Sequence, residues 1–291
     1  MPVLPRAGSR FRVRLPAAPL ICGNKIPIIN RSSPVLTAPK PPLSLLLSIL
    51  LAAAPCAPDG PGSVLRCSET VTAGGTSVEV IYAPGDADVA RQVRGVLPAA
   101  LQEATRWGAL PASVTLAVHA THAELEAATG RAGAPWMRAW ARPGKVDLQS
   151  PATWTRGFAS DAALTQILTH ELSHCVLFHA AGPEGTRRIP TWFQEGMASV
   201  SAGERHAVAD GAALREAGPG RRGDPRRFYG TADRAFRLLL ERFGEPRLRS
   251  LLHRLGDGIP FASAFEDALG LPVAEFEGDV SRRLDAVAVG G

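Results

Sequence analysis

The sequence predicts an α+β domain in which a small N-terminal mixed sheet and its helices pack on a mainly helical C-terminal half. Segments with the two-residue alternation of half-buried strands occur only before residue 150, whereas apolar residues recur with helical spacing from residue 161 onward. Strands followed along the chain by helices are typical of α+β domains. The chain has 291 residues, 45% of them hydrophobic, which is enough for a sizeable core.

Residues 1–57 are predicted to be a basic leader that ends in a signal peptide. All charged residues before position 59 are Lys or Arg, so the net charge of +5 is concentrated there and the remainder is nearly neutral. This distribution argues against a nucleic-acid partner. The apolar run at residues 43–54 is too short to cross a membrane as a helix but suits the hydrophobic part of a secretory signal. We therefore expect an exported protein that is periplasmic, envelope-associated or secreted.

Alternatives remain open for this leader. The run at 43–54 also fits a buried core helix, and the long stretch before it is compatible with a misassigned start near Val35. Cys56 follows Pro55 and small residues, so it is a candidate for lipidation and membrane anchoring, although the sequence is a poor lipidation signal. Export would permit a disulfide between Cys67 and Cys175, whereas the apolar surroundings of Cys175 fit a buried free thiol equally well.

The segment 58–76 is rich in Gly, Ser, Thr and Pro and is predicted to be a linker, followed by one domain at 77–287. Within that domain we expect strands at Ser77–Tyr82 and Ser113–His119. A long helix capped by Asp86 or Asp88 and ending near Trp107, a short helix from Thr121 to Gly130, and a hairpin of 137–142 and 145–149 around Pro143-Gly144 complete this half. The hairpin also offers an edge to which an extended peptide could add as a strand.

The second half is predicted to be helical. Apolar periodicity places helices near 161–180, 190–203, 229–243, 246–255 and 273–287. The segment 181–188 is expected to be a connecting loop. The segment Arg215–Arg227 is rich in Arg, Gly and Pro, and we expect a surface loop near the cleft.

The strongest chemical signal is His170-Glu171-Leu172-Ser173-His174, an HExxH sequence inside an apolar helix. Residues four apart lie on one face of a helix, so the two imidazoles can bind one ion. Glu171 is turned by about 100° from His170, so it can reach a water molecule at the ion without being a ligand. Two core histidines would be the structural alternative.

Glu195 is the candidate third ligand. A catalytic zinc site has three protein ligands and one open position. The segment Pro190–Ala198 (PTWFQEGMA) predicts a helix with Glu195 on an otherwise apolar stretch, where a buried carboxylate needs a cation as partner. His170, His174 and Glu195 therefore predict a site for one Zn²⁺ per chain.

The HELSH and PTWFQEGMA motifs resemble the gluzincin metallopeptidases, most closely the bacterial peptidase MA-like domains, over residues 77–287. The resemblance implies a zincin-like active-site helix, zinc ligands at His170, His174 and Glu195, and a general base at Glu171. It also implies a transition-state-stabilising role for Tyr229, with His206 as a weaker rival. In other gluzincins the residue four after the ligand glutamate supports a ligand histidine; here it is Ser199, which could do so only weakly.

The function expected from these residues is hydrolysis of a peptide or protein by a zinc-dependent peptidase. A catalytically inactive zinc-binding module for envelope protein interactions is the main alternative. A structural envelope protein with an accidental HExxH is a further one, and the setting of Glu195 argues against it.

Overall fold

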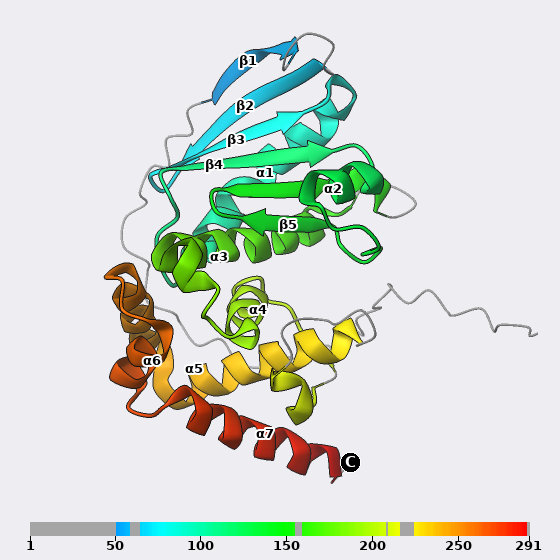
Figure 1. The fold of residues 1–291 in the computed structure, drawn as a ribbon. Coiled ribbons are helices and arrows are strands. Elements are labelled where there is room, and N and C mark those ends of the chain that lie inside the picture. Colours follow the sequence, from blue (N-terminus) through cyan, green and yellow to red (C-terminus); the bar gives the residue numbers. More distant parts are fainter. Residues whose placement is uncertain (1–50, 59–64, 155–158, 208, 216–223, 290–291) are drawn as a thin grey trace, which may run out of the picture. The chain divides into compact units, whose positions relative to one another are not determined.

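The computed structural model describes residues 51–58, 65–154, 159–207, 209–215 and 224–289, to which every structural statement here refers. Its N-terminal half forms one six-stranded sheet in the order β1-β2-β3-β4-β6-β5 (Figure 1). The strands are β1 (Leu51–Pro58), β2 (Leu65–Ala73), β3 (Thr76–Tyr82), β4 (Ser113–His119), β5 (Ala139–Arg142) and β6 (Lys145–Gln149). Helices dominate after residue 160, so the α+β prediction is confirmed.

The sheet is mixed. Strands β3, β4 and β6 are mutually parallel, and each remaining pair of neighbours is antiparallel. Helix α1 (Ala87–Ala104) connects β3 to β4, as a crossover between parallel strands requires. Helix α2 (His122–Thr129) begins at Thr121, whose hydroxyl accepts a hydrogen bond from the Glu124 amide, and ends at the left-handed Gly130. The strands and helices expected in this half from residue 77 onward are therefore confirmed.

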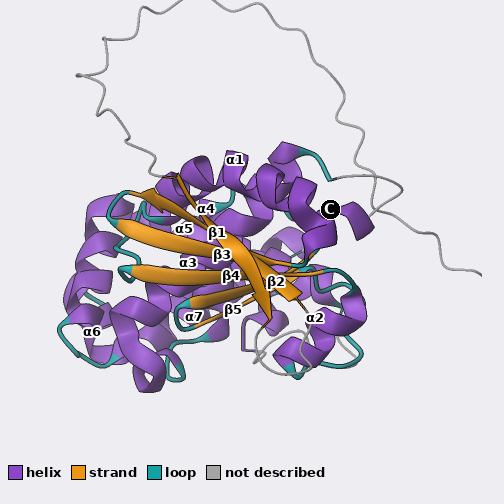
Figure 2. Ribbon diagram, turned by 90° about the horizontal axis from the view of Figure 1, so that it is seen from above, coloured by secondary structure: helices purple, strands orange, loops and turns teal. Residues whose placement is uncertain are grey.

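One face of the sheet is covered by α1 and by α3 (Asp161–Thr186), and Figure 2 shows α1 along one side of the strands. Val78, Val80 and Leu116 from the strands are at most 1% exposed and belong to the same hydrophobic core as residues of both helices. Ser160 caps α3 by accepting a hydrogen bond from the Ala163 amide. This packing fixes α3, the helix that carries HExxH, against the sheet.

A second hydrophobic core lies in the helical half. It joins α4 (Thr191–Ser201), α5 (Pro225–Gly256), α6 (Phe261–Leu269) and α7 (Val273–Val289) around buried aromatic side chains that include Trp192, Phe193 and Phe265. The predicted helices 229–243 and 246–255 are two parts of α5, which breaks at Gly244 with φ 74°. Helix α3 breaks in the same way at Gly182 (φ 67°), within the segment expected to be a loop.

The linker prediction for 58–76 is wrong where β2 lies. Cys67, Val71 and Ala73 are buried on one side of this strand, and it pairs with β3 along its length. Its Ser and Thr residues occupy the less buried alternate positions, so a composition that indicates a linker here belongs to a half-buried strand. Helix α6 has no counterpart among the helix ranges expected from periodicity.

Residues 1–50, which hold most of the predicted leader, lie outside the described part of the chain. Residues 51–58, expected to end the leader, form β1 and pair with β2. Cys56 is joined to Cys67 by a disulfide, and Cys175 is a buried free thiol. The pairing of Cys67 with Cys175 is therefore wrong, and the disulfide uses the sulfur that lipidation of Cys56 would need. Among the described residues, no helix combines the length and apolar character needed to span a membrane.

Candidate metal centre

Helix α3 presents both histidines of the HExxH sequence. Leu168 and Leu172 are 0% exposed and pack into the sheet-side core. The side chains of His170 and His174 lie on another face of the helix and are 12% and 11% exposed. The two rings meet edge to face, with 5.0 Å between their centroids. The i, i+4 spacing therefore brings two imidazoles together, as predicted.

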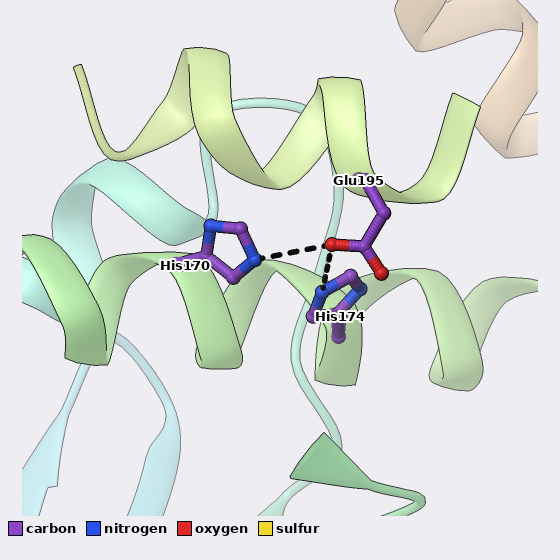
Figure 3. Close-up of side chains that lie close together, drawn as sticks. All are labelled: His170, His174 and Glu195. Atoms are coloured by element: carbon purple, nitrogen blue, oxygen red, sulfur yellow. Dashed lines mark ion pairs between the residues drawn. The ribbon is translucent and has the colours of Figure 1, made fainter. Parts of the chain in front are cut away.

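Glu195 approaches these imidazoles from α4. Its Oε2 atom lies 3.4 Å from Nε2 of His170 and 3.5 Å from Nε2 of His174 (Figure 3). One potential ligand atom from each of the three residues lies within 4.8 Å of the others. The structure thus brings together the three residues predicted to bind the metal.

The residues present fit a zinc ion. Two imidazole nitrogens and one carboxylate oxygen form a common donor set for catalytic zinc. Burial raises the pKa of Glu195, but His174 and His170 outweigh it and hold that pKa well below its ordinary value. Burial lowers the pKa of His170, whereas Glu204, Glu195 and Glu171 raise it well above its ordinary value. The carboxylates therefore favour positive charge at this place, and a bound cation would supply it.

Gly196 allows α4 to approach α5 closely enough to place Glu195. A Cβ atom at this glycine would lie 2.3 Å from the carbonyl oxygen of Ala232 and 2.7 Å from Cβ of Phe236. Both neighbours belong to α5. The glycine after Glu195 is thus required by helix packing, and the buried Trp192 and Phe193, four and three residues before it on the same face, anchor the same helix.

Glu204 is a functional candidate that the sequence predictions missed. Its Oε1 atom lies 3.2 Å from Nδ1 of His170, at ion-pair distance but outside hydrogen-bond geometry. Its Oε2 atom accepts a hydrogen bond from Ser199 Oγ at 2.7 Å and lies 3.1 Å from Nε2 of His206. Ser199 therefore acts on Glu204 rather than on either candidate ligand histidine. An acidic residue just past the helix of the candidate third ligand was the available signal.

Glu171 lies in the same cavity as the proposed ligands. Burial raises its pKa above the ordinary value, and Glu195 adds to this effect. His170, His174 and the backbone amide of Ala141 on β5 act in the opposite direction. A carboxylate with a raised pKa accepts protons more readily than an exposed glutamate does.

Tyr229 lies near the start of α5, as its fifth residue, and contributes to the same cavity. Its ring contacts Trp136 edge to face and stacks on His206, with 6.2 Å between centroids in each pair. Burial, followed by the charges of Glu195, Glu171 and Glu204, raises the pKa of Tyr229 well above its ordinary value. Its hydroxyl therefore keeps its proton near neutral pH and is available as a donor.

The cavity has a volume of about 280 Å³, and every residue proposed for catalysis or metal binding lines it. Met137–Ala141 also line the cavity, and the last three of these residues belong to the edge strand β5. Most of the predicted surface loop Arg215–Arg227, residues 216–223, lies outside the described part of the chain. Its last residues, from Pro225, begin α5.

Comparisons with known proteins give a structural likeness alone. No protein-family model matches the sequence, and no curated protein matches it either. Similar solved structures include the M1 zinc metallopeptidase from Deinococcus radiodurans (15% identity, TM-score 0.43, 81% of this chain and 51% of that chain). An aminopeptidase N family protein from Idiomarina loihiensis gives 12% identity and TM-score 0.44 over 81% of this chain and 53% of that chain.

Legionella pneumophila aminopeptidase A, in complex with aspartic acid, gives 12% identity and a TM-score of 0.43. The match covers 79% of this chain and 27% of that one. The chain thus spans about half or less of the length of these structures. The function proposed below rests on the geometry of the site.

Proposed function

We propose that this protein is a zinc-dependent metallopeptidase that hydrolyses peptide bonds. The observation that carries this proposal is the convergence of His170, His174 and Glu195 in a cavity that also contains the carboxylate of Glu171. Glu171 is outside the candidate ligand set and, unlike Glu204, which contacts His170, makes no ion pair with the histidines among the described residues, so its carboxylate is available for proton transfer.

The roles of the residues follow from their positions. His170, His174 and Glu195 would hold the ion. When bound, zinc supplies Lewis-acid activation of a water molecule and of the substrate carbonyl. The Glu171 carboxylate takes the proton from the attacking water and delivers it to the leaving amine. Its raised pKa suits both transfers, because the residue must first accept the proton and then release it.

Tyr229 is proposed to stabilise the negative charge that develops on the substrate oxygen. Its pKa is raised well above the ordinary value, so it donates a hydrogen bond without losing its proton. Trp136, Met137 and Phe178 also line the cavity, and these apolar side chains exclude water around the reacting groups.

The test combines metal content with peptide cleavage. Purified protein should bind one zinc ion per chain and cleave members of a broad peptide library, and Glu171→Gln should retain zinc while losing at least about 100-fold in rate. Glu195→Ala should lower zinc affinity sharply. Retention of full zinc affinity would disprove the third-ligand assignment. Equal, very slow cleavage by the parent chain and Glu171→Gln would leave a zinc-binding module without peptidase activity.

We propose in addition that the protein is exported. The apolar run at 43–54, which continues into β1 at Leu51, supports this, and so does the Cys56–Cys67 disulfide, because such bonds persist mainly in oxidising compartments. Leu46→Arg combined with Leu50→Arg should block export, since charges in the centre of a hydrophobic segment are costly to insert. Unchanged export of this variant, measured by cell fractionation, would contradict the proposal.

A further inference from the structure

The carboxylates of the cavity are already engaged. Glu195 faces both ligand imidazoles, Glu204 lies between His170 and His206, and Glu171 is the proposed base. Among the described residues that line the cavity, no other carboxylate is present. A substrate ammonium group would therefore have to compete with the contacts that these carboxylates already make. A substrate carboxylate would instead need a positively charged side chain at the edge of the cavity.

Arg131, which packs on a residue of the cavity wall without itself lining the cavity, is the candidate for such a cation. Its guanidinium carbon lies 3.4 Å from the centroid of the Trp140 ring, and Trp140 lines the cavity. Burial lowers the pKa of Arg131, while Tyr229 and Glu195, both lining the cavity, raise it. Arg131 in turn opposes the rise in the pKa of Tyr229. The charge of Arg131 is therefore felt by Tyr229 and Glu195 in the cavity.

The loop that carries Arg131 is held in place. The backbone amide of Arg131 donates to the carbonyl of Glu126 at 3.1 Å, just after the left-handed end of α2. The carboxylate of Glu126 accepts hydrogen bonds from the amides of Gly133 and Ala134 at 2.8 and 3.1 Å. A guanidinium on such a loop, stacked on a ring, loses little conformational freedom when it binds a ligand.

Arg131 also has no carboxylate partner within ion-pair distance among the residues that the structure describes, although most other arginines of this domain do. Arg138, which lines the same cavity, differs. Its guanidinium donates to the carbonyls of Pro135 and Met137 at 2.9 and 3.2 Å. A planar guanidinium with free donors is suited to bidentate recognition of a carboxylate.

We infer that Arg131 recognises a carboxylate of the substrate, either an acidic side chain near the cleaved bond or a free C-terminus. This inference rests on the proposed peptidase function and assigns it a substrate class. The two sources of the carboxylate share one chemistry, and matched peptides distinguish them. Peptides with Glu are compared with their Gln counterparts, and peptides with a free C-terminus are compared with C-terminal amides.

The experiment measures binding of these peptides to the zinc-loaded Glu171→Gln chain by calorimetry, and cleavage of the same peptides by the chain with Glu171 intact. In the Glu171→Gln background, Arg131→Gln should weaken binding of the carboxylate-bearing peptide in one of the two matched pairs by about tenfold or more. This is the loss expected when a charge-assisted contact is removed. The affinity for the uncharged peptide of that pair should change by less than about twofold. Arg131→Lys should recover part of the preference because it restores the charge.

Arg138→Gln is the matched control, and thermal unfolding shows that each variant is folded. Equal losses for the carboxylate and amide peptides would overturn the inference, because Arg131 would then act only by packing on Trp140. An equal loss of preference in Arg138→Gln would also overturn it, because any positive charge at the rim would suffice. Absence of cleavage by the Glu171 chain would contradict the peptidase proposal alone, since the binding comparison does not depend on turnover.

Discussion

Oε1 of Glu204 lies 3.2 Å from Nδ1 of His170, while its Oε2 accepts a hydrogen bond from Ser199 at 2.7 Å. A carboxylate at the far nitrogen of a ligand imidazole fixes the tautomer and the direction of the ring. Here it leaves Nε2 of His170 directed at Glu195. Glu204 is thus a positioning residue for the candidate metal centre.

Glu204→Ala should lower zinc affinity by about 10- to 100-fold, the range found when such outer partners are removed. Competition with a chelating dye measures this affinity. Ser199→Ala should have a smaller effect, because Glu204 would keep its contact with His170. Glu103→Ala, an exposed glutamate on α1, is the control and should bind zinc normally. Unchanged affinity in Glu204→Ala would remove Glu204 from the site.

Tyr229→Phe should lower kcat by about 100-fold while zinc content stays unchanged, since an oxyanion donor acts only as charge develops. Tyr82→Phe is a matched control because Tyr82 is the other tyrosine of the chain. The Tyr82 hydroxyl donates to Glu69 at 2.8 Å within the sheet. Its loss should reduce the free energy of unfolding by about 1 kcal/mol and leave cleavage intact. Comparable kcat for Tyr229→Phe and the parent chain would argue for a packing role.

Gly196→Ala should destabilise the protein and weaken zinc binding together, because the added Cβ would meet the backbone of α5 at 2.3 Å. Overpacking of this kind costs about 1–3 kcal/mol. Gly95→Ala on α1 is the opposite case, since its Cβ would enter open space. That variant should be neutral or up to about 1 kcal/mol more stable. Urea unfolding of both variants, with zinc titration, tests the contrast.

Asp147 gives the protein a pH-dependent stability. Its side chain is 0% exposed and lies 2.9 Å from Nε2 of His119 and 3.1 Å from Nζ of Lys145, with Arg142 as a third partner. Burial raises its pKa, but these partners outweigh burial and lower it from 3.8 to about 2. The stabilisation is therefore complete only above about pH 5 and is lost progressively as the pH falls through 3.8 toward about 2.

By linkage, this shift corresponds to about 2 kcal/mol. Asp147→Asn should consequently differ most from the parent chain at pH 5–7, and the difference should shrink by about that amount near pH 2. Urea unfolding of the two chains across this pH range measures it. A difference that stays constant with pH would mean that the Asp147 charge does not stabilise the fold.

Much of the site could be predicted from the sequence because its determinants are local. The four-residue spacing on a helix is enough to bring His170 and His174 together. The position of Glu195 on an apolar segment predicts a buried carboxylate with a cation as its partner. The hairpin around Pro143-Gly144 follows from turn chemistry, since Gly144 adopts φ 68°. In each case, the responsible physical preference lies within a few neighbouring residues.

Glu204 and Arg131 could not be predicted in this way. Glu204 gains its role because the chain turns back after α4. Arg131 gains its role because the loop after α2 places it against Trp140 on β5. Strand β2 was missed for a related reason. Its alternation is masked by Ser and Thr, and only pairing with β3 shows which residues face the core. All three depend on tertiary contacts that the neighbouring sequence does not show.

The two hydrophobic cores of the molecule have a mechanical consequence. The helix of His170 and His174 packs mainly in the sheet-side core, whereas the helix of Glu195 packs in the aromatic core of the other half. An ion held by all three side chains would act as a crosslink between two separately packed halves. At a free zinc concentration 1,000 times its Kd, this linkage adds about 4 kcal/mol against unfolding. Chelation should therefore loosen the junction of the halves first, so that melting broadens or divides into two transitions.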